Sequence, residues 1–261
     1  MHAPQYHETL FSRVYPGRQE SSPCYLPAVH QLEAFLAFTP AQRQRTILRT
    51  DAGFGSDANI NAVLADDWQV LTKNKGGRRP DAYAGRVPAD GWQAIVGNRQ
   101  ITALPQPLTY CRPTQAHLLR WWSEAGLEKH AIVIGSIMAW SPQELITHYD
   151  ARGACEKEIQ SDKVGLRMEK WRKKRLSAQE ALILLTDVAH NLLAWTGHWM
   201  FPTGDLAGYG PLRLIEDVLC LPGHLIFADE RLSEVHLNEL HPHAAATAAG
   251  LERLFKHFGH P

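Results

Sequence analysis

Four residues that could bind metal or phosphate lie three, four and seven residues apart in a short segment of the sequence: Tyr149, Arg152, Glu156 and Lys163. On an ideal α-helix, which turns about 100° per residue, these four side chains share one narrow face. A carboxylate binds a hard cation through oxygen, while the cationic groups and the hydroxyl suit phosphate oxygens. The face therefore indicates a metal-assisted phosphodiester site. A solvated helix face with Glu–Arg and Glu–Lys pairs would contain the same residues.

A second carboxylate lies at the end of a short β-branched run, Thr46–Thr50. Asp51 follows this run directly and is itself followed by Gly53-Phe54-Gly55. A carboxylate at the end of a strand is well placed to share a metal ion with Glu156. The competing interpretation is that Asp51 is a turn residue or a helix cap.

These residues resemble the motifs of a large group of bacterial insertion-sequence transposases. The spacing from Tyr149 to Lys163 matches that group's Y-x2-R-x3-E-x6-K signature, and Arg49-Thr50-Asp51 is similar to the motif of its second aspartate. A later apolar helix in the group has a Leu-Thr-Asp…His-Asn-Leu pattern, which here runs from Leu185 to Leu192. The resemblance extends from near Gln5 to the C-terminus.

The resemblance implies an RNase H-like catalytic domain of the DDE type. Asp51 would be the second triad carboxylate and Glu156 the third, and together they would hold Mg²⁺ in a two-metal site. Tyr149, Arg152 and Lys163 would contact DNA. The partners implied are double-stranded DNA at transposon ends and target, and a second copy in a full-length homodimer. The implied location is the bacterial cytoplasm, at the nucleoid.

The sequence departs from the family pattern at the first catalytic aspartate, which the family carries on its first core strand. No aspartate precedes Asp51, and the early carboxylates Glu8 and Glu20 do not match the motif. The family's N-terminal end-recognition domain has no counterpart either. We therefore expect a truncated copy that is inactive in cleavage. The alternatives are a non-catalytic DNA-binding remnant and an unrelated α/β interaction protein whose helix face mimics the signature.

The order of predicted elements is that of an α/β fold. A strand is expected over Tyr6–Val14, a helix over Leu26–Phe38, and strands over Thr46–Thr50 and Trp68–Thr72. Asp57 is placed to cap the helix between the two later strands. This alternation predicts a mixed sheet flanked by helices, as in an RNase H-like fold.

The second half of the chain predicts further elements. Ala131–Met138 reads as a buried strand, and two capping boxes, Ser141 with Glu144 and Ser177 with Glu180, each open a helix. The second of these helices reaches Trp195. The predicted divisions are a first part of the core over 1–73, a β-rich insertion over 74–130, a second part of the core over 131–200 and a C-terminal extension over 201–261.

The composition limits the kinds of partner and site. Lys and Arg together number 27 and equal Asp and Glu, so only local clusters indicate a polyanion. Two such clusters are the Arg167–Arg175 stretch and a set near residue 75: Lys73, Lys75, Arg78 and Arg79. Four tryptophans are candidates for core packing or base stacking: Trp92, Trp121, Trp122 and Trp140. Widely spaced cysteines argue against a disulfide framework, and the sequence predicts no membrane span.

Two structural expectations follow. The carboxylates of Asp51 and Glu156 should lie within roughly 8 Å of each other. The side chains of Tyr149, Arg152 and Lys163 should matter for DNA binding and contribute little to folding.

Overall fold

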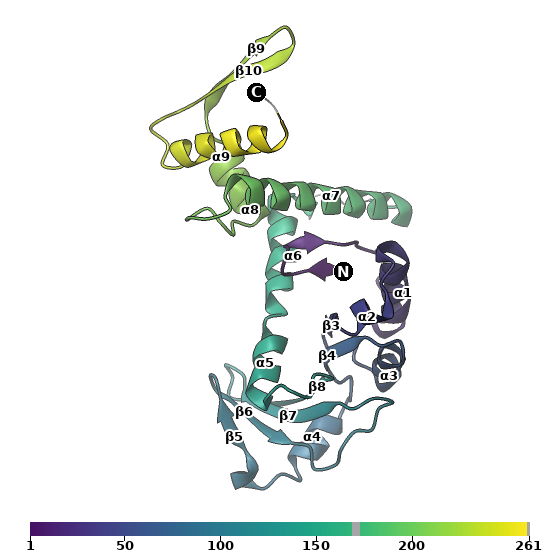
Figure 1. Cartoon of the computed structure of the whole chain (residues 1–261). Helices are drawn as coiled ribbons and strands as arrows, with labels where there is room; N and C mark the ends of the chain where they lie inside the picture. The colour runs from purple at the N-terminus through teal and green to yellow at the C-terminus, as the bar shows by residue number, and fades with distance from the viewer. Residues whose placement is uncertain (169–172, 260–261) are drawn as a thin grey trace. The chain divides into compact units, whose positions relative to one another are not determined.

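A computed structural model describes residues 1–168 and 173–259 of the chain (Figure 1). The chain divides into two compact units. One unit comprises Arg18–Gly153, and the other comprises Met1–Gly17 together with Ala154–Pro261. The basic stretch Arg167–Arg175 falls partly outside the described residues, which omit 169–172.

A mixed six-stranded sheet organises the unit Arg18–Gly153, with the strand order β3-β4-β8-β7-β6-β5. The strands are β3 (Ile47–Thr50), β4 (Gln69–Lys73), β5 (Gln93–Ile95), β6 (Arg99–Ala103), β7 (Gln115–Trp122) and β8 (Glu128–Gly135). β3 and β4 are parallel, and every other pair in this sheet is antiparallel. The strands predicted at Thr46–Thr50, Trp68–Thr72 and Ala131–Met138 are confirmed, the last only as far as Gly135. The strands expected within 74–130 also form, and they extend the same sheet.

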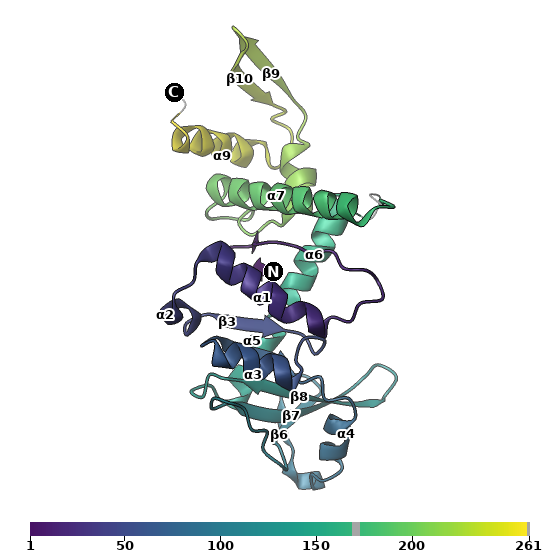
Figure 2. The ribbon, with the colours of Figure 1, turned by 90° about the vertical axis from the view of Figure 1, so that its right-hand side faces the viewer.

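Helices cover both faces of this sheet. α1 (Tyr25–Leu36) and α3 (Asp57–Ala65) lie on one side of β3 and β4, and α5 (Pro142–Asp150) lies on the other (Figures 1 and 2). The short helices are α2 (Pro40–Arg43) and α4 (Arg79–Ala84), and α4 packs against β7 and β8. The predicted cap at Asp57 is wrong, because Ser56 is the N-cap residue and its side chain accepts the Asn59 N–H.

The core of this unit joins the sheet to α5. Sheet residues Leu71, Ile101 and Val133 pack with Leu145 and Tyr149 of the helix in one buried cluster. The Ser141–Glu144 capping box predicted for this helix forms in full. It satisfies N–H groups that would otherwise lack a partner at the start of the helix. The cap and the buried face together fix where α5 begins and how it docks.

The prediction that one continuous helix carries Tyr149 to Lys163 is wrong, because the helix is interrupted after Asp150. α5 ends at Asp150 and α6 (Gly153–Gly165) begins three residues later. The Arg152 N–H bonds to the Tyr149 carbonyl, three residues back, which tightens the backbone there. Glycine at position 153 has low helix propensity and allows the break.

The second unit is mainly helical. After α6 come α7 (Leu176–Met200), α8 (Pro211–Leu214), the π-helix η4 (Ile215–Leu219), the hairpin β9 (Gly223–Ala228) and β10 (Arg231–Leu237), and α9 (Ala244–His257). Its buried cluster is small: Met200, Phe201, Leu206, Leu214 and Val218. The capping box predicted at Ser177 does not form, because α7 starts at Leu176 and the N-cap residue is Arg175. None of the helices described is long and apolar enough to cross a membrane.

The N-terminal segment lies beside α7 in this unit (Figure 1). The strand predicted over Tyr6–Val14 is wrong, because only β1 (His2–Ala3) and β2 (Glu8–Thr9) pair, as a two-residue ladder. The side chain of Asn191 takes the place of a further strand. Its Oδ1 accepts the Thr9 N–H at 2.8 Å, and its Nδ2 donates to the Thr9 carbonyl at 2.8 Å.

Candidate functional site

Asp51 is an exposed carboxylate at the carboxyl end of β3. Its Oδ1 accepts the Gly53 N–H at 2.9 Å, which orients the side chain. The buried Thr72 on the neighbouring strand donates its hydroxyl to the Asp51 carbonyl at 3.3 Å. Both the side chain and the backbone of Asp51 are therefore held in place, while the carboxylate still faces solvent.

Steric crowding explains why glycine follows Asp51 at position 55. A Cβ atom on Gly55 would lie 1.9 Å from the Lys73 carbonyl oxygen, so the loop can approach the end of β4 only if this position is glycine. The Gly55 carbonyl accepts the Lys75 N–H at 2.8 Å across the same contact. Between the two glycines, the ring of Phe54 packs 5.8 Å from that of Tyr25. The Gly-Phe-Gly sequence thus clamps the Asp51 loop onto β4.

Tyr149 joins the cationic groups of this unit. The Lys73 Nζ atom lies 5.0 Å from the Tyr149 ring centroid and 5.2 Å from that of Trp121. The Arg152 guanidinium lies 5.5 Å from the Tyr149 ring. Contacts of this kind between a cation and an aromatic face stabilise the cation in a fixed position. The structure therefore brings Tyr149 and Arg152 together, as predicted, and adds Lys73.

The Asp51 carboxylate is close enough to affect the pKa of the Tyr149 hydroxyl. Burial raises the pKa of the Tyr149 hydroxyl; the charge of Arg152 and its hydrogen bond lower it, and the nearby Asp51 carboxylate raises it further. The net effect is a raised pKa, so the hydroxyl stays protonated at neutral pH. Three of the five predicted site residues thus gather at one end of the sheet.

Tyr149 is also a core residue, with only 3% of its surface exposed. The expectation that its side chain contributes little to folding does not fit this burial. The sequence pattern presents the tyrosine as one member of a polar helix face. In the structure its ring packs with Leu71 and Leu145, and its hydroxyl is the polar end of a buried side chain.

Polar contacts fix the end of α5 beside this cluster. Arg49 Nη1 donates to the His148 carbonyl at 2.8 Å, and Arg99 pairs with Asp150 at 2.6 Å. The His148 ring stacks on Trp140 at 4.2 Å between centroids. Arg49, two residues before Asp51, therefore has a structural role, because it ties β3 to the end of α5.

Glu156 and Lys163 lie on α6, in the other unit. Seven residues on one helix are close to two full turns, so these two side chains share a face as predicted. Glu156 is exposed and lies in the first turn, where a negative charge is stabilised by the helix dipole. Because Asp51 belongs to the first unit, the expected approach of Asp51 to Glu156 stays a prediction.

Residues of the Leu-Thr-Asp…His-Asn-Leu pattern on α7 form hydrogen bonds with the N-terminal segment and with α6. His190 is buried, and its two ring nitrogens lie 2.8 Å from Asp162 Oδ1 and 2.8 Å from the His7 carbonyl. Asp187 accepts the Ser12 hydroxyl at 2.8 Å. Burial lowers the pKa of His190, but Asp162 and the His7 carbonyl outweigh it, so its pKa is raised. With Asn191, these residues clasp the N-terminal segment to α6 and α7.

The early carboxylate Glu8 belongs to the same clasp. Its Oε1 accepts the Trp195 N–H at 2.7 Å. Glu20, the other early carboxylate, lies in the first unit and pairs with Lys75 at 3.0 Å. Each of the two therefore has a protein partner.

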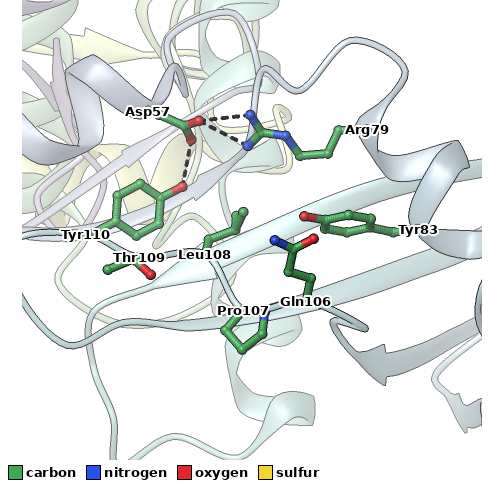
Figure 3. Close-up of a pocket in the computed structure, with 8 residues that line it drawn as sticks. All are labelled: Asp57, Arg79, Tyr83, Gln106, Pro107, Leu108, Thr109 and Tyr110. Atoms are coloured by element: carbon green, nitrogen blue, oxygen red, sulfur yellow. Dashed lines mark hydrogen bonds and ion pairs between the residues drawn. The ribbon is translucent and has the colours of Figure 1, made fainter.

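A polar pocket of about 260 Å³ lies beside Asp57. Figure 3 shows the Asp57 carboxylate between Arg79 and Tyr110. Both Nη atoms of Arg79 lie 3.0 Å from one oxygen, and the Tyr110 hydroxyl and Asn74 each donate to the other at 2.8 Å. Partial burial would raise the pKa of Asp57, but these hydrogen bonds and the charge of Arg79 lower it overall. Asp57 thus ties α3, α4, the end of β4 and the loop before β7 together.

The chemistry of Asp51 fits a hard cation. Its carboxylate is exposed at the edge of the sheet, and one of its oxygens already has a donor that fixes its direction. Glu156 offers the same kind of ligand from α6. Within the described part of the chain, no group of three or more His, Cys, Asp and Glu side chains is arranged to hold a metal ion.

A family model decides what kind of protein has this arrangement. The model described as "Transposase DDE domain group 1" matches residues 5–258. The chain belongs to this family. The six-stranded mixed sheet flanked by helices is consistent with the RNase H-like fold of DDE transposases. Because this match includes residues of both units, the alternative interpretation as an unrelated α/β interaction protein is wrong. No curated protein matches the chain.

Sequence reasoning did not identify Lys73 as a candidate site residue, although its ammonium group lies near Tyr149. The sequence presents it only as a member of a basic cluster, whereas the structure places it between the rings of Trp121 and Tyr149. The one local signal is a lysine that closely follows the apolar strand residues Val70 and Leu71. Its aromatic neighbours are distant in sequence, so their proximity has no local signal.

Proposed function

We propose that this chain is the part of a DDE transposase that grips DNA phosphates around a Mg²⁺ site formed by Asp51 and Glu156. The observation that carries the proposal is the cluster at the carboxyl end of β3 and β4. There, an exposed aspartate lies near Tyr149, whose ring contacts two cations, Lys73 and Arg152. A carboxylate for metal beside fixed cations for phosphate is the arrangement that phosphodiester chemistry requires.

The chain's own residues have distinct tasks in this proposal. Bound Mg²⁺ would activate the attacking water or DNA 3′-hydroxyl and stabilise the leaving oxygen. Asp51 and Glu156 would hold it. Arg152 and Lys163 would contact phosphate oxygens through charge-assisted hydrogen bonds, and Lys73 would add a cation held by its aromatic neighbours. Tyr149 keeps its proton and so has an O–H to donate.

Double-stranded DNA at transposon ends and at the target is the proposed substrate, at the bacterial nucleoid. We expect the 261-residue chain on its own to bind DNA without cleaving it. The family's first aspartate would supply a further metal ligand, and the sequence before Asp51 contains no aspartate. A supercoiled plasmid with the element's ends, incubated with the chain and Mg²⁺ or Mn²⁺, should stay intact. Specific nicking that Glu156→Ala abolishes would contradict this expectation.

DNA binding measured against salt concentration tests the proposed phosphate-binding residues. Removing one cation that neutralises a phosphate lowers the slope of the log–log plot by about one. Arg152→Ala and Lys163→Ala should each lower the slope in this way. Lys157→Ala is the matched control, because Lys157 is an exposed lysine on α6 one residue from Glu156, off the predicted face. Equal effects of Lys157→Ala and Lys163→Ala would show that the face has no special role.

A further inference from the structure

One side of α7 carries an apolar stripe that is exposed. The exposed fractions are 63% for Leu185, 56% for Val188, 54% for Leu192 and 38% for Trp195. The spacings between them are three, four and three residues. This alternation is the a/d pattern of a coiled-coil seam, and Ala178 and Ala181 continue it toward the start of the helix. The stripe is therefore patterned to pack against another helix.

The rest of α7 already has neighbours within its unit. Thr186, His190 and Met200 are buried on its other side. α9 lies beside the C-terminal part of the helix, where Trp199 stacks on His257 at 5.1 Å, and the N-terminal part extends beyond it (Figures 1 and 2). Leu185, Val188 and Leu192 thus lie outside the surfaces that hold α9 and the N-terminal clasp, whereas Trp195 also borders the clasp, because its N–H bonds to Glu8.

The stripe has no charge to oppose pairing with its own copy. From Ala181 to Met200 the only Asp, Glu, Lys or Arg residue is Asp187, which accepts a hydrogen bond from Ser12. A seam that met an acidic or basic partner would carry complementary charges along its flanks. Two identical neutral seams meet without repulsion, and antiparallel pairing also places opposite helix-dipole ends together.

If two copies of α7 pair antiparallel, the large residues of one stripe face the small residues of the other. When two copies run antiparallel, with Leu185 of one against Val188 of the other, each a position faces a d position. The facing pairs are then Trp195 with Ala178, Leu192 with Ala181, and Leu185 with Val188. Large residues thus face small ones in the outer layers, the condition for interdigitated packing.

We propose that α7 pairs antiparallel with α7 of a second copy of this chain through this stripe. The proposal gives a surface to the homodimer that the family resemblance implies, and it does not rest on the proposed metal site. It holds whether or not the chain binds metal or cleaves DNA. The dimer is therefore measured without either, so that its failure is distinguishable from failure of the Asp51 site.

Light scattering after size-exclusion chromatography, at micromolar concentration, measures the mass directly. We expect twice 29.3 kDa for the unaltered chain and 29.3 kDa for Leu185→Asp. Leu185 is exposed, so helix content by circular dichroism should persist. The matched control is Phe35→Asp, since Phe35 is 71% exposed on α1 and lies outside the stripe. A monomeric unaltered chain, or a dimer that survives Leu185→Asp, would overturn the proposal.

A second variant distinguishes this register from nonspecific hydrophobic association. Ala181→Trp adds apolar area but places a large ring against Leu192 of the second copy, so it should weaken the dimer. Exchanging the sizes, with Ala181→Leu and Leu192→Ala together, keeps one large and one small residue in each of these layers and should leave the dimer intact. A tighter dimer for Ala181→Trp, or a monomeric exchanged double variant, would overturn the pairing.

Discussion

The two compact units hold their candidate site residues by different means. In Arg18–Gly153, the site depends on contacts between distant parts of the sequence. Lys73 ends a strand, Tyr149 lies near the end of a helix, and the Asp51 loop fits only because Gly55 passes close to β4. In the other unit, Glu156 and Lys163 need only the periodicity of α6 to share a face. The long-range contacts there hold the N-terminal segment to α7 instead.

The two units should therefore respond differently to substitutions. Damage to the core of the first unit should remove the cation cluster, because Tyr149 belongs to both. Damage to the clasp in the second unit should reduce stability while α6 keeps its own geometry. Substitutions can therefore separate the two units by comparing the decrease in stability with the decrease in DNA binding.

The largest effect is expected at Tyr149. Tyr149→Ala removes a buried ring, and core substitutions of aromatic residues by alanine cost about 3–5 kcal/mol. Tyr149→Phe keeps the ring and should cost only about 1 kcal/mol. Urea denaturation measures both. A loss below about 1 kcal/mol for Tyr149→Ala would show that the site of the first unit does not depend on its core.

The clasp should give the next largest effect. His190→Ala leaves the buried Asp162 without its partner, and breaking a buried charged pair costs about 3 kcal/mol. His190 has a raised pKa, so its contribution is fully present below its ordinary pKa of 6.5 and is lost as the pH rises through the raised value. The difference in unfolding free energy between the unaltered chain and the variant should shrink over that range. A difference that grows with pH would contradict the assignment.

Asp57 should have an intermediate effect within the first unit. Asp57→Asn weakens the contacts with Arg79 and Tyr110, at a cost of about 1 kcal/mol, because the Asp57 side chain is 45% exposed and water screens the ion pair. The pKa of Asp57 is lowered, so its contribution is present above the ordinary value of 3.8 and is lost as the pH falls through the lowered value. Denaturation at pH 7 and again in acid should show the gap between the two proteins closing. A constant gap would mean that ionised Asp57 stabilises nothing.

Lys163 should show the smallest effect on stability. It lies on α6, where its place depends on helix periodicity alone, so Lys163→Ala should change the unfolding free energy by less than about 0.5 kcal/mol. The same variant should lower the salt slope of DNA binding by about one. A large change in melting temperature with unchanged DNA affinity would mean that Lys163 is a structural residue.

Elements with strong local signals could be predicted from the sequence. The β-branched run before Asp51, the apolar spacing of α1 and the capping box at Ser141 each indicate the correct element. Expectations failed where a distant contact decides the structure. Asn191 supplies the hydrogen bonds that a longer strand at Tyr6–Val14 would have made. The box at Ser177 failed for a local reason, because the N-cap residue of α7 is Arg175, two residues earlier.

The candidate site follows the same rule. Helix periodicity identifies the shared face of Glu156 and Lys163, but it could not reveal the break at Arg152, where backbone hydrogen bonding and Gly153 interrupt the helix. Periodicity also could not show that Tyr149 is buried, because burial depends on strands from elsewhere in the chain. The aromatic neighbours of Lys73 come from two such separate elements.

The central proposal is that Asp51 and Glu156 hold the same metal ion. Titration with Mn²⁺, followed by the decrease of its free electron paramagnetic resonance signal, tests this most directly. We predict that Asp51→Asn and Glu156→Gln each abolish the same tight binding, and that the double variant loses no more than either one. Unchanged Mn²⁺ affinity in either single variant would contradict the shared site.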